Sequence, residues 1–95
     1  MKVISLDASA WRSPEDFYSA LLPQLAAPAW HGHNLDALDE SLGAGDINGL
    51  EPPFRVEIEG SGNLSEPMQR FLSEVERLFA DIRAKNQRQI DFQLR

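Results

Sequence analysis

The second half of the chain combines two kinds of hydrophobic pattern, and their order restricts the fold more than any other feature. Residues 54–59 and 90–95 alternate strictly between apolar and polar side chains, which is typical of strands with one face in water. Between them, apolar residues recur at helical spacing over residues 65–86, which predicts a long helix that ends near Asn86. A strand, a helix and a strand in this order favour parallel pairing through a right-handed crossover.

The first half of the chain adds another strand and two more helices. Residues 2–6 predict a strand with apolar side chains on both faces, which suits the middle of a sheet. Ser13, followed by a proline and two acids, predicts the start of a helix that Pro23 ends or kinks. Asn34 is the predicted N-cap of a short helix that ends at residues 43–45.

Together these segments predict an α/β fold with two layers, in which helices pack on one face of a three-stranded parallel sheet. The polar faces of the two later strands leave only the opposite face for helices. A length of 95 residues fits one domain, residues 1–95. The chain has no cysteine, and its N-terminal apolar run is too short for a signal peptide or a membrane span, so the expected location is the cytoplasm.

The charged residues are distributed unevenly. Residues 13–54 contain no lysine or arginine, yet they carry seven carboxylates: Glu15, Asp16, Asp36, Asp39, Glu40, Asp46 and Glu51. The net charge of −6 disfavours nucleic acid and anionic membranes as direct partners, because both attract basic surfaces. The acidic stretch instead predicts a basic protein as the partner.

Three of these carboxylates crowd the short second helix. Asp36 stands three residues before Asp39 and four before Glu40, so all three share one side of the helix. Like charges at this spacing destabilise a helix, and such an arrangement persists most easily where a cation meets it. The preferred interpretation is a docking site for a basic protein. A plain solvated face and a metal site are the alternatives.

The metal and enzyme alternatives have little support in the sequence. His31 and His33 precede the acidic helix, but no third ligand follows at a spacing typical of a metal site. Asp36 and Glu40 could act as a general acid and base, yet no nucleophile or phosphate-binding loop accompanies them. We therefore expect no enzyme, no metal and no cofactor.

The two tryptophans need separate interpretations. Trp11 precedes the first helix, where an aromatic side chain usually covers a small core. Trp30 lies in the loop that leads to the acidic helix, and an interface anchor and a core residue are equally compatible with that place.

One segment carries a longer motif. It begins with Ser13-Pro14-Glu15-Asp16-Phe17, passes Pro28, and continues as Trp30-His31-Gly32-His33-Asn34-Leu35-Asp36-Ala37-Leu38-Asp39-Glu40-Ser41-Leu42. This segment resembles the barstar family, whose members are intracellular inhibitors of a secreted bacterial ribonuclease. The resemblance implies a three-stranded parallel sheet with helices, in agreement with the hydrophobic patterns.

The resemblance also implies a mechanism, in which the loop and the acidic helix plug the basic active site of the ribonuclease. The residues predicted to bind the partner are Trp30, His31, Asn34, Asp36, Asp39, Glu40 and Asp81. His31 replaces an aromatic residue, Asp39 stands where tryptophan is usual, and Glu40 is one methylene longer than the family's aspartate. The alternatives are an orphan immunity protein or a barstar-fold interaction module whose basic partner is not a nuclease.

Overall fold

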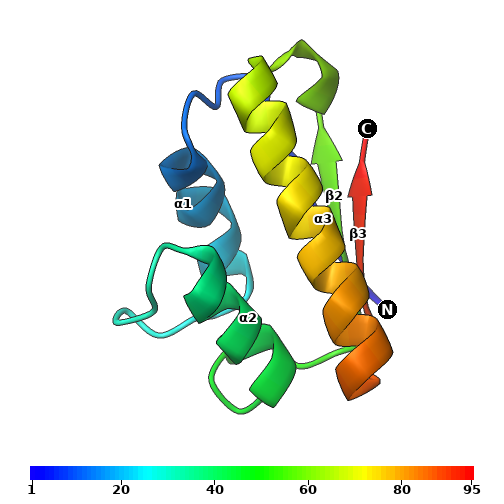
Figure 1. Ribbon diagram of the computed structural model, residues 1–95. Coiled ribbons are helices and arrows are strands. Elements are labelled where there is room, and N and C mark those ends of the chain that lie inside the picture. The colour runs from blue at the N-terminus through cyan, green and yellow to red at the C-terminus, as the bar shows by residue number, and fades with distance from the viewer.

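The computed structural model covers residues 1–95 and has the predicted α/β architecture, a parallel sheet with helices on one of its faces (Figure 1). The elements in chain order are β1 (Lys2–Asp7), α1 (Pro14–Gln24), α2 (Leu35–Ala44), β2 (Phe54–Glu59), the 3₁₀ helix η1 (Ser61–Asn63), α3 (Glu66–Asn86) and β3 (Ile90–Leu94). The three strands lie in the order β1-β2-β3, and both pairs are parallel. The prediction of a three-stranded parallel sheet is confirmed.

The central strand is β2, so the prediction that residues 2–6 occupy the middle of the sheet is wrong. β1 lies at the edge and pairs with β2 alone. Val3 pairs with Arg55 on the face that the helices leave uncovered, and its side chain is 45% exposed. The valine fits a strand because of its β-branched side chain, and this preference does not require burial.

The hydrophobic core fills the space between the sheet and the helices. The sheet contributes Ile4, Leu6, Phe54, Val56, Ile58, Ile90 and Phe92. The helices contribute Phe17, Tyr18, Leu21, Leu22, Leu38, Leu42, Met68, Leu72, Val75, Phe79 and Ile82. Trp11 packs edge-on against Phe17, with 5.8 Å between the ring centroids, and is partly buried on the core, as its predicted covering role requires.

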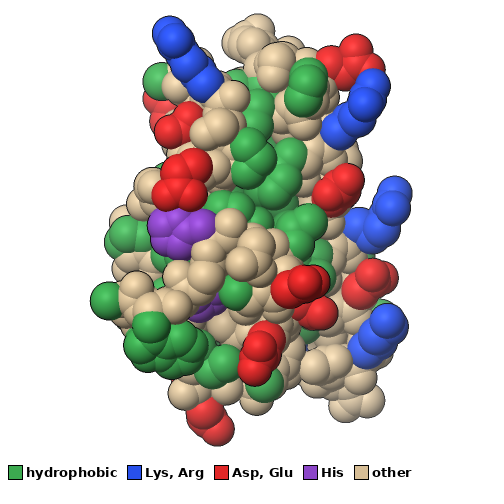
Figure 2. Space-filling model, turned by 60° about the vertical axis from the view of Figure 1, so that its left-hand side comes forward, with side chains coloured by type: hydrophobic (Ala, Val, Ile, Leu, Met, Phe, Trp, Pro, Cys, Tyr) green, Lys and Arg blue, Asp and Glu red, His purple; other side chains and the backbone are tan.

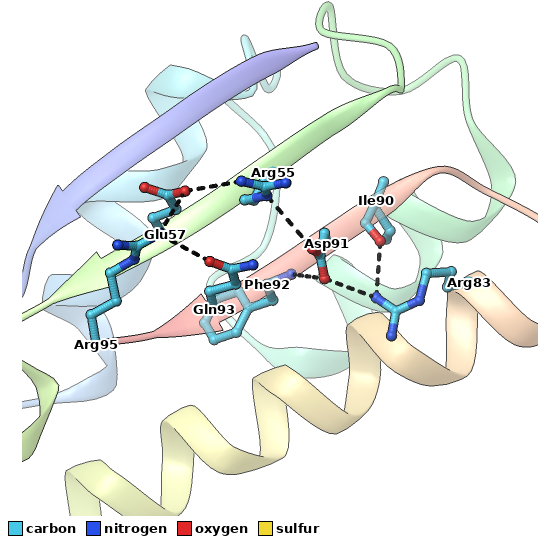
Figure 3. Close-up of polar contacts among 8 residues, drawn as sticks. All are labelled: Arg55, Glu57, Arg83, Ile90, Asp91, Phe92, Gln93 and Arg95. Carbon is cyan, nitrogen blue, oxygen red and sulfur yellow. Dashed lines mark hydrogen bonds and ion pairs between the residues drawn. The ribbon is translucent and has the colours of Figure 1, made fainter.

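The uncovered face of the sheet carries alternating charges that pair with one another (Figure 3). The Glu57 carboxylate lies 3.3 Å from Arg55 Nη1 and 3.1 Å from Arg95 Nη2. Asp91 lies 3.6 Å from Arg55 Nε and 3.3 Å from Arg83 Nη1, which reaches it from α3. Glu57 and Asp91 thus each meet two arginines, so this part of the face is polar and its charges largely compensate one another.

The ends of α1 and α3 follow local sequence signals with one exception. Pro23 stands in the last turn of α1, and the helix ends one residue later at Gln24. Ser65 caps the N-terminus of α3 and accepts a hydrogen bond from the backbone N–H of Met68. Helix α3 ends at Asn86, as the pattern predicts, but its C-cap is the next residue, Gln87, in the left-handed conformation.

Candidate protein-docking site

The acidic helix α2 is anchored at both ends. The side chain of Asn34 accepts a hydrogen bond of 2.7 Å from the backbone N–H of Ala37, so its predicted role as N-cap is confirmed. At the other end, Asn86 of α3 donates through Nδ2 to the carbonyl of Gly43 at 2.9 Å. Asn86 is the last residue of α3, so this second bond joins the C-terminal ends of the two helices. It satisfies one of the carbonyls that the last turn of α2 leaves without a helical partner.

The outer face of α2 presents the three predicted carboxylates to solvent. Asp36, Asp39 and Glu40 are all exposed, while Leu38 and Leu42 on the opposite face are buried in the core. None of the three acids takes part in an ion pair, although eight ion pairs form elsewhere in the chain. Figure 2 shows acidic groups over this part of the surface, with the basic groups at its upper left and along the right-hand edge.

Asp81 joins this group from α3. Asp39 and Asp81 line the same hollow of about 340 Å³ between α2 and α3, so the structure brings these two predicted residues together. Lys85, one turn further along α3, lines the hollow as well. We call Asp36, Asp39, Glu40 and Asp81 the acidic surface.

Trp30 lies beside the acidic surface and is 75% exposed, so the core alternative for this residue is wrong. It lines a smaller hollow of about 80 Å³ together with Glu40, Ala37 and Ile47. An indole held at the surface next to a carboxylate offers a partner both apolar contact area and a hydrogen-bond donor.

The two histidines of the α1–α2 loop (residues 25–34) point in different directions. His31 is only 5% exposed, and its ring nitrogens face Gly32 and Ser41. His33 lies at the surface, where Nδ1 is 2.7 Å from a Glu15 carboxylate oxygen and the ring stacks on Tyr18. The structure therefore separates the histidines, and it contains no group of three side chains suited to hold a metal ion.

The comparison with protein families decides how this geometry is classified. The family described as Barstar (barnase inhibitor) matches residues 1–95. The chain belongs to the barstar family. The resemblance that the sequence carried over residues 13–42 is thereby confirmed and extends along the whole chain. No curated protein matches the chain.

Membership in the barstar family settles two broader predictions. Members of this family are inhibitors of ribonuclease and not enzymes, and they bind a barnase-like ribonuclease.

The helices of this chain are all too short or too polar to cross a membrane.

Sequence reasoning missed two buried polar residues behind the acidic surface. Ser41 and Asn48 are 3% and 8% exposed, and Asn48 Nδ2 donates to Ser41 Oγ at 3.2 Å. Ser41 falls three residues after Leu38, on the buried face of α2. A serine at a core position of a helix is the signal that could have identified it, because buried hydroxyls require partners.

Proposed function

We propose that this barstar-family chain inhibits a barnase-like ribonuclease by placing the acidic surface and Trp30 in the basic active site of the enzyme. The observation that supports this mechanism is that the carboxylates on α2 are exposed to solvent and form no ion pairs. Asp36, Asp39 and Glu40 lie within two turns of one helix, and none of them forms an ion pair within the chain.

The electrostatics favour a partner whose surface is basic. Mutual repulsion among the three carboxylates destabilises α2 in the free protein, by a few tenths of a kcal/mol for each pair. A cleft that binds RNA carries lysine and arginine to hold phosphates, and these groups would relieve the repulsion. The carboxylates then occupy the places that phosphates take in the complex with RNA.

The rigidity of α2 supports the same mechanism. Asn34 caps the N-terminus, Asn86 binds the C-terminal carbonyl of Gly43, and the buried leucines fix the rotation of the helix about its axis. A helix that is already ordered loses little conformational entropy when it binds. Asn34 therefore acts mainly by holding the N-terminus of α2 and the adjacent loop in place.

The hollow between α2 and α3 gives the acidic surface a recess. Asp39 and Asp81 face this hollow, and an arginine or lysine of the nuclease fits its volume and charge. Lys85 at the same hollow limits how much positive charge can enter. Trp30 adds apolar contact beside Glu40, as aromatic residues commonly do at interfaces.

The test removes two charges from α2 without changing the size of the side chains. Each buried hydrogen bond to a charged group contributes about 1.5–3 kcal/mol, so Asp36→Asn with Glu40→Gln should weaken binding to a barnase-like ribonuclease at least about 100-fold. Isothermal titration calorimetry gives the Kd, and an RNA-hydrolysis assay gives the inhibition.

The matched control changes the net charge equally but leaves the four carboxylates of the acidic surface in place. Asp46→Asn with Glu76→Gln removes two exposed, unpaired carboxylates and should leave the Kd within about threefold. An unchanged Kd in the Asp36 and Glu40 variant would refute the acidic-surface mechanism. Tight binding without inhibition would instead support the alternative, a barstar-fold module that binds a basic protein.

A further inference from the structure

A chain of buried polar groups lies behind the acidic surface, and the proposed contacts do not use it. His31 comes from the α1–α2 loop, Ser41 from α2, and Asn48 from the loop that follows α2. His31 Nε2 lies 2.8 Å from Ser41 Oγ, and Asn48 Nδ2 donates to the same oxygen at 3.2 Å. One hydroxyl of α2 thus joins the loops on both sides of the helix.

The hydrogen bonds fix the orientation of the His31 ring in either charge state. Nδ1 lies 2.7 Å from the carbonyl oxygen of Gly32, which can only accept, so Nδ1 carries a proton. In a neutral ring, Nε2 accepts from the Ser41 hydroxyl. In a protonated ring, Nε2 donates to Ser41 Oγ, and the hydroxyl turns to the Leu38 carbonyl at 3.2 Å. Both ring nitrogens are bonded in each case.

This arrangement connects the two parts of the docking site. Trp30 immediately precedes His31 in sequence, and Glu40 immediately precedes Ser41. All four residues line the hollow of about 80 Å³. The bond between His31 and Ser41 therefore ties the backbone that carries Trp30 to the backbone that carries Glu40.

The polar chain costs stability that an apolar core would not. Oδ1 of Asn48 is buried without a hydrogen-bond partner, and an unsatisfied buried acceptor disfavours the folded state. An apolar side chain of similar volume at this position would avoid that cost. In return, the hydrogen bonds to Ser41 hold the loops on both sides of α2 against the helix.

We propose that His31 is a positioning residue, which holds the α1–α2 loop through Ser41 so that Trp30 and Glu40 meet the same partner together. This inference rests on the proposed function and assigns His31 an indirect part in it, because its side chain is buried. Without the bond between His31 and Ser41, the loop is more mobile in the free protein. It then loses more conformational entropy when it binds, and this loss lowers the affinity.

Two substitutions at His31 separate the two hydrogen bonds. The amide of glutamine reaches the place of Nε2 and keeps the bond to Ser41, whereas the amide of asparagine reaches only the place of Nδ1. We expect His31→Gln to bind a barnase-like ribonuclease within about threefold of the unmodified protein. We expect His31→Asn to bind about tenfold more weakly, which corresponds to about 1.4 kcal/mol.

Ser41→Ala removes the same bond from the side of the helix and should also weaken binding about tenfold. The double variant His31→Asn with Ser41→Ala should be no weaker than either single variant, because both remove one interaction. If His31→Asn fails to fold, the Ser41→Ala measurement decides the question. Equal Kd values for His31→Gln, His31→Asn and Ser41→Ala would overturn the inference.

A measurement on the free protein separates this inference from the proposed function. In a Trp11→Phe background Trp30 is the remaining tryptophan, and its time-resolved fluorescence anisotropy reports the mobility of the loop. Mobility should rise in His31→Asn and in Ser41→Ala but not in His31→Gln. If mobility changes in this way but Asp36→Asn with Glu40→Gln binds as tightly as the unmodified protein, the acidic-surface mechanism is refuted. The role of His31 in positioning the loop is then retained. Identical anisotropy in all variants would refute the positioning role.

Discussion

Tyr18 shows how the packing of this small core changes the chemistry of a single residue. Its side chain is 2% exposed, and its ring packs edge-on against Phe17 and Phe71 and stacks on His33. Burial, with a smaller contribution from the Glu74 carboxylate, raises the pKa of Tyr18 to about 12. Both causes disfavour the phenolate, which would carry a negative charge in an apolar site beside another negative charge.

The raised pKa of Tyr18 predicts a loss of stability in alkaline solution. Between the ordinary value of 10.0 and about 12, the unfolded chain releases the phenol proton and the folded chain keeps it. The contribution of Tyr18 to the free energy of unfolding is therefore constant below pH 10 and falls by up to about 1.4 kcal/mol for each pH unit between pH 10 and about 12. Urea unfolding measured from pH 9 to pH 12 should show this fall, and Tyr18→Phe should show a shallower one. Parallel curves for the two proteins would contradict the assignment.

His31 and Trp30 mark the limit of prediction at the residue scale. They are neighbours in the α1–α2 loop, yet one is 5% and the other 75% exposed. A helix or strand reveals its buried face through the period of its apolar residues, but an irregular loop has no period. The sequence therefore placed both residues at the docking site without showing that His31 points inward. The burial of the ring and its hydrogen bond to Ser41 show that direction in the structure.

Helix α1 is held at its start by an acidic side chain. The Asp16 carboxylate accepts hydrogen bonds from the backbone N–H groups of Arg12, at 2.7 Å, and Ser13, at 3.2 Å. These bonds fix the chain as it enters the helix, and the charge favours the positive end of the helix dipole.

Asp16→Ala should lower the free energy of unfolding by about 1 kcal/mol, because it removes both bonds and the charge. Asp16→Asn keeps an acceptor oxygen and should recover part of the loss. Urea denaturation of the two variants at neutral pH provides the comparison. Equal stability of Asp16→Ala and the unmodified protein would show that the bonds contribute nothing.

Element bounds were predictable where local signals are strong. The strand at residues 54–59 matches its prediction, and Asn34 and Ser65 cap the helices expected of them. The order of strands was less predictable, because it depends on contacts between segments far apart in sequence. Val3 gives β1 an apolar side chain on each face, which is typical of a central strand. Its pairing with Arg55 and its exposure show that the face of the sheet that carries Val3 is open to solvent.

On the scale of the whole molecule, the charges divide into paired and unpaired regions. On the open face of the sheet, Glu57 and Asp91 pair with Arg55, Arg83 and Arg95, whereas the acidic surface has no ion pair. Four carboxylates of a chain with a net charge of −6 are therefore gathered without ion pairs in the acidic surface. A field concentrated on one side orients a basic partner as well as attracting it.

This distribution predicts that salt slows association more than it changes dissociation. The Debye length falls from about 30 Å at 0.01 M to about 8 Å at 0.15 M ionic strength, so approaching proteins sense each other over a shorter distance. We expect the association rate constant to fall at least about tenfold over this range in stopped-flow experiments, because long-range attraction raises encounter rates by 10-fold or more at low salt. The dissociation rate should change little, since contacts in the complex are shielded from solvent.

The two charge-matched double variants show which carboxylates cause the dependence of the association rate on salt. Asp36→Asn with Glu40→Gln and Asp46→Asn with Glu76→Gln change the net charge equally, but only the first pair removes charge from the acidic surface. We expect the first variant to show a shallower dependence of association on salt and the second to keep nearly the full dependence. Equal slopes for the two would mean that net charge alone attracts the partner, and the position of the carboxylates on α2 would then matter only after contact.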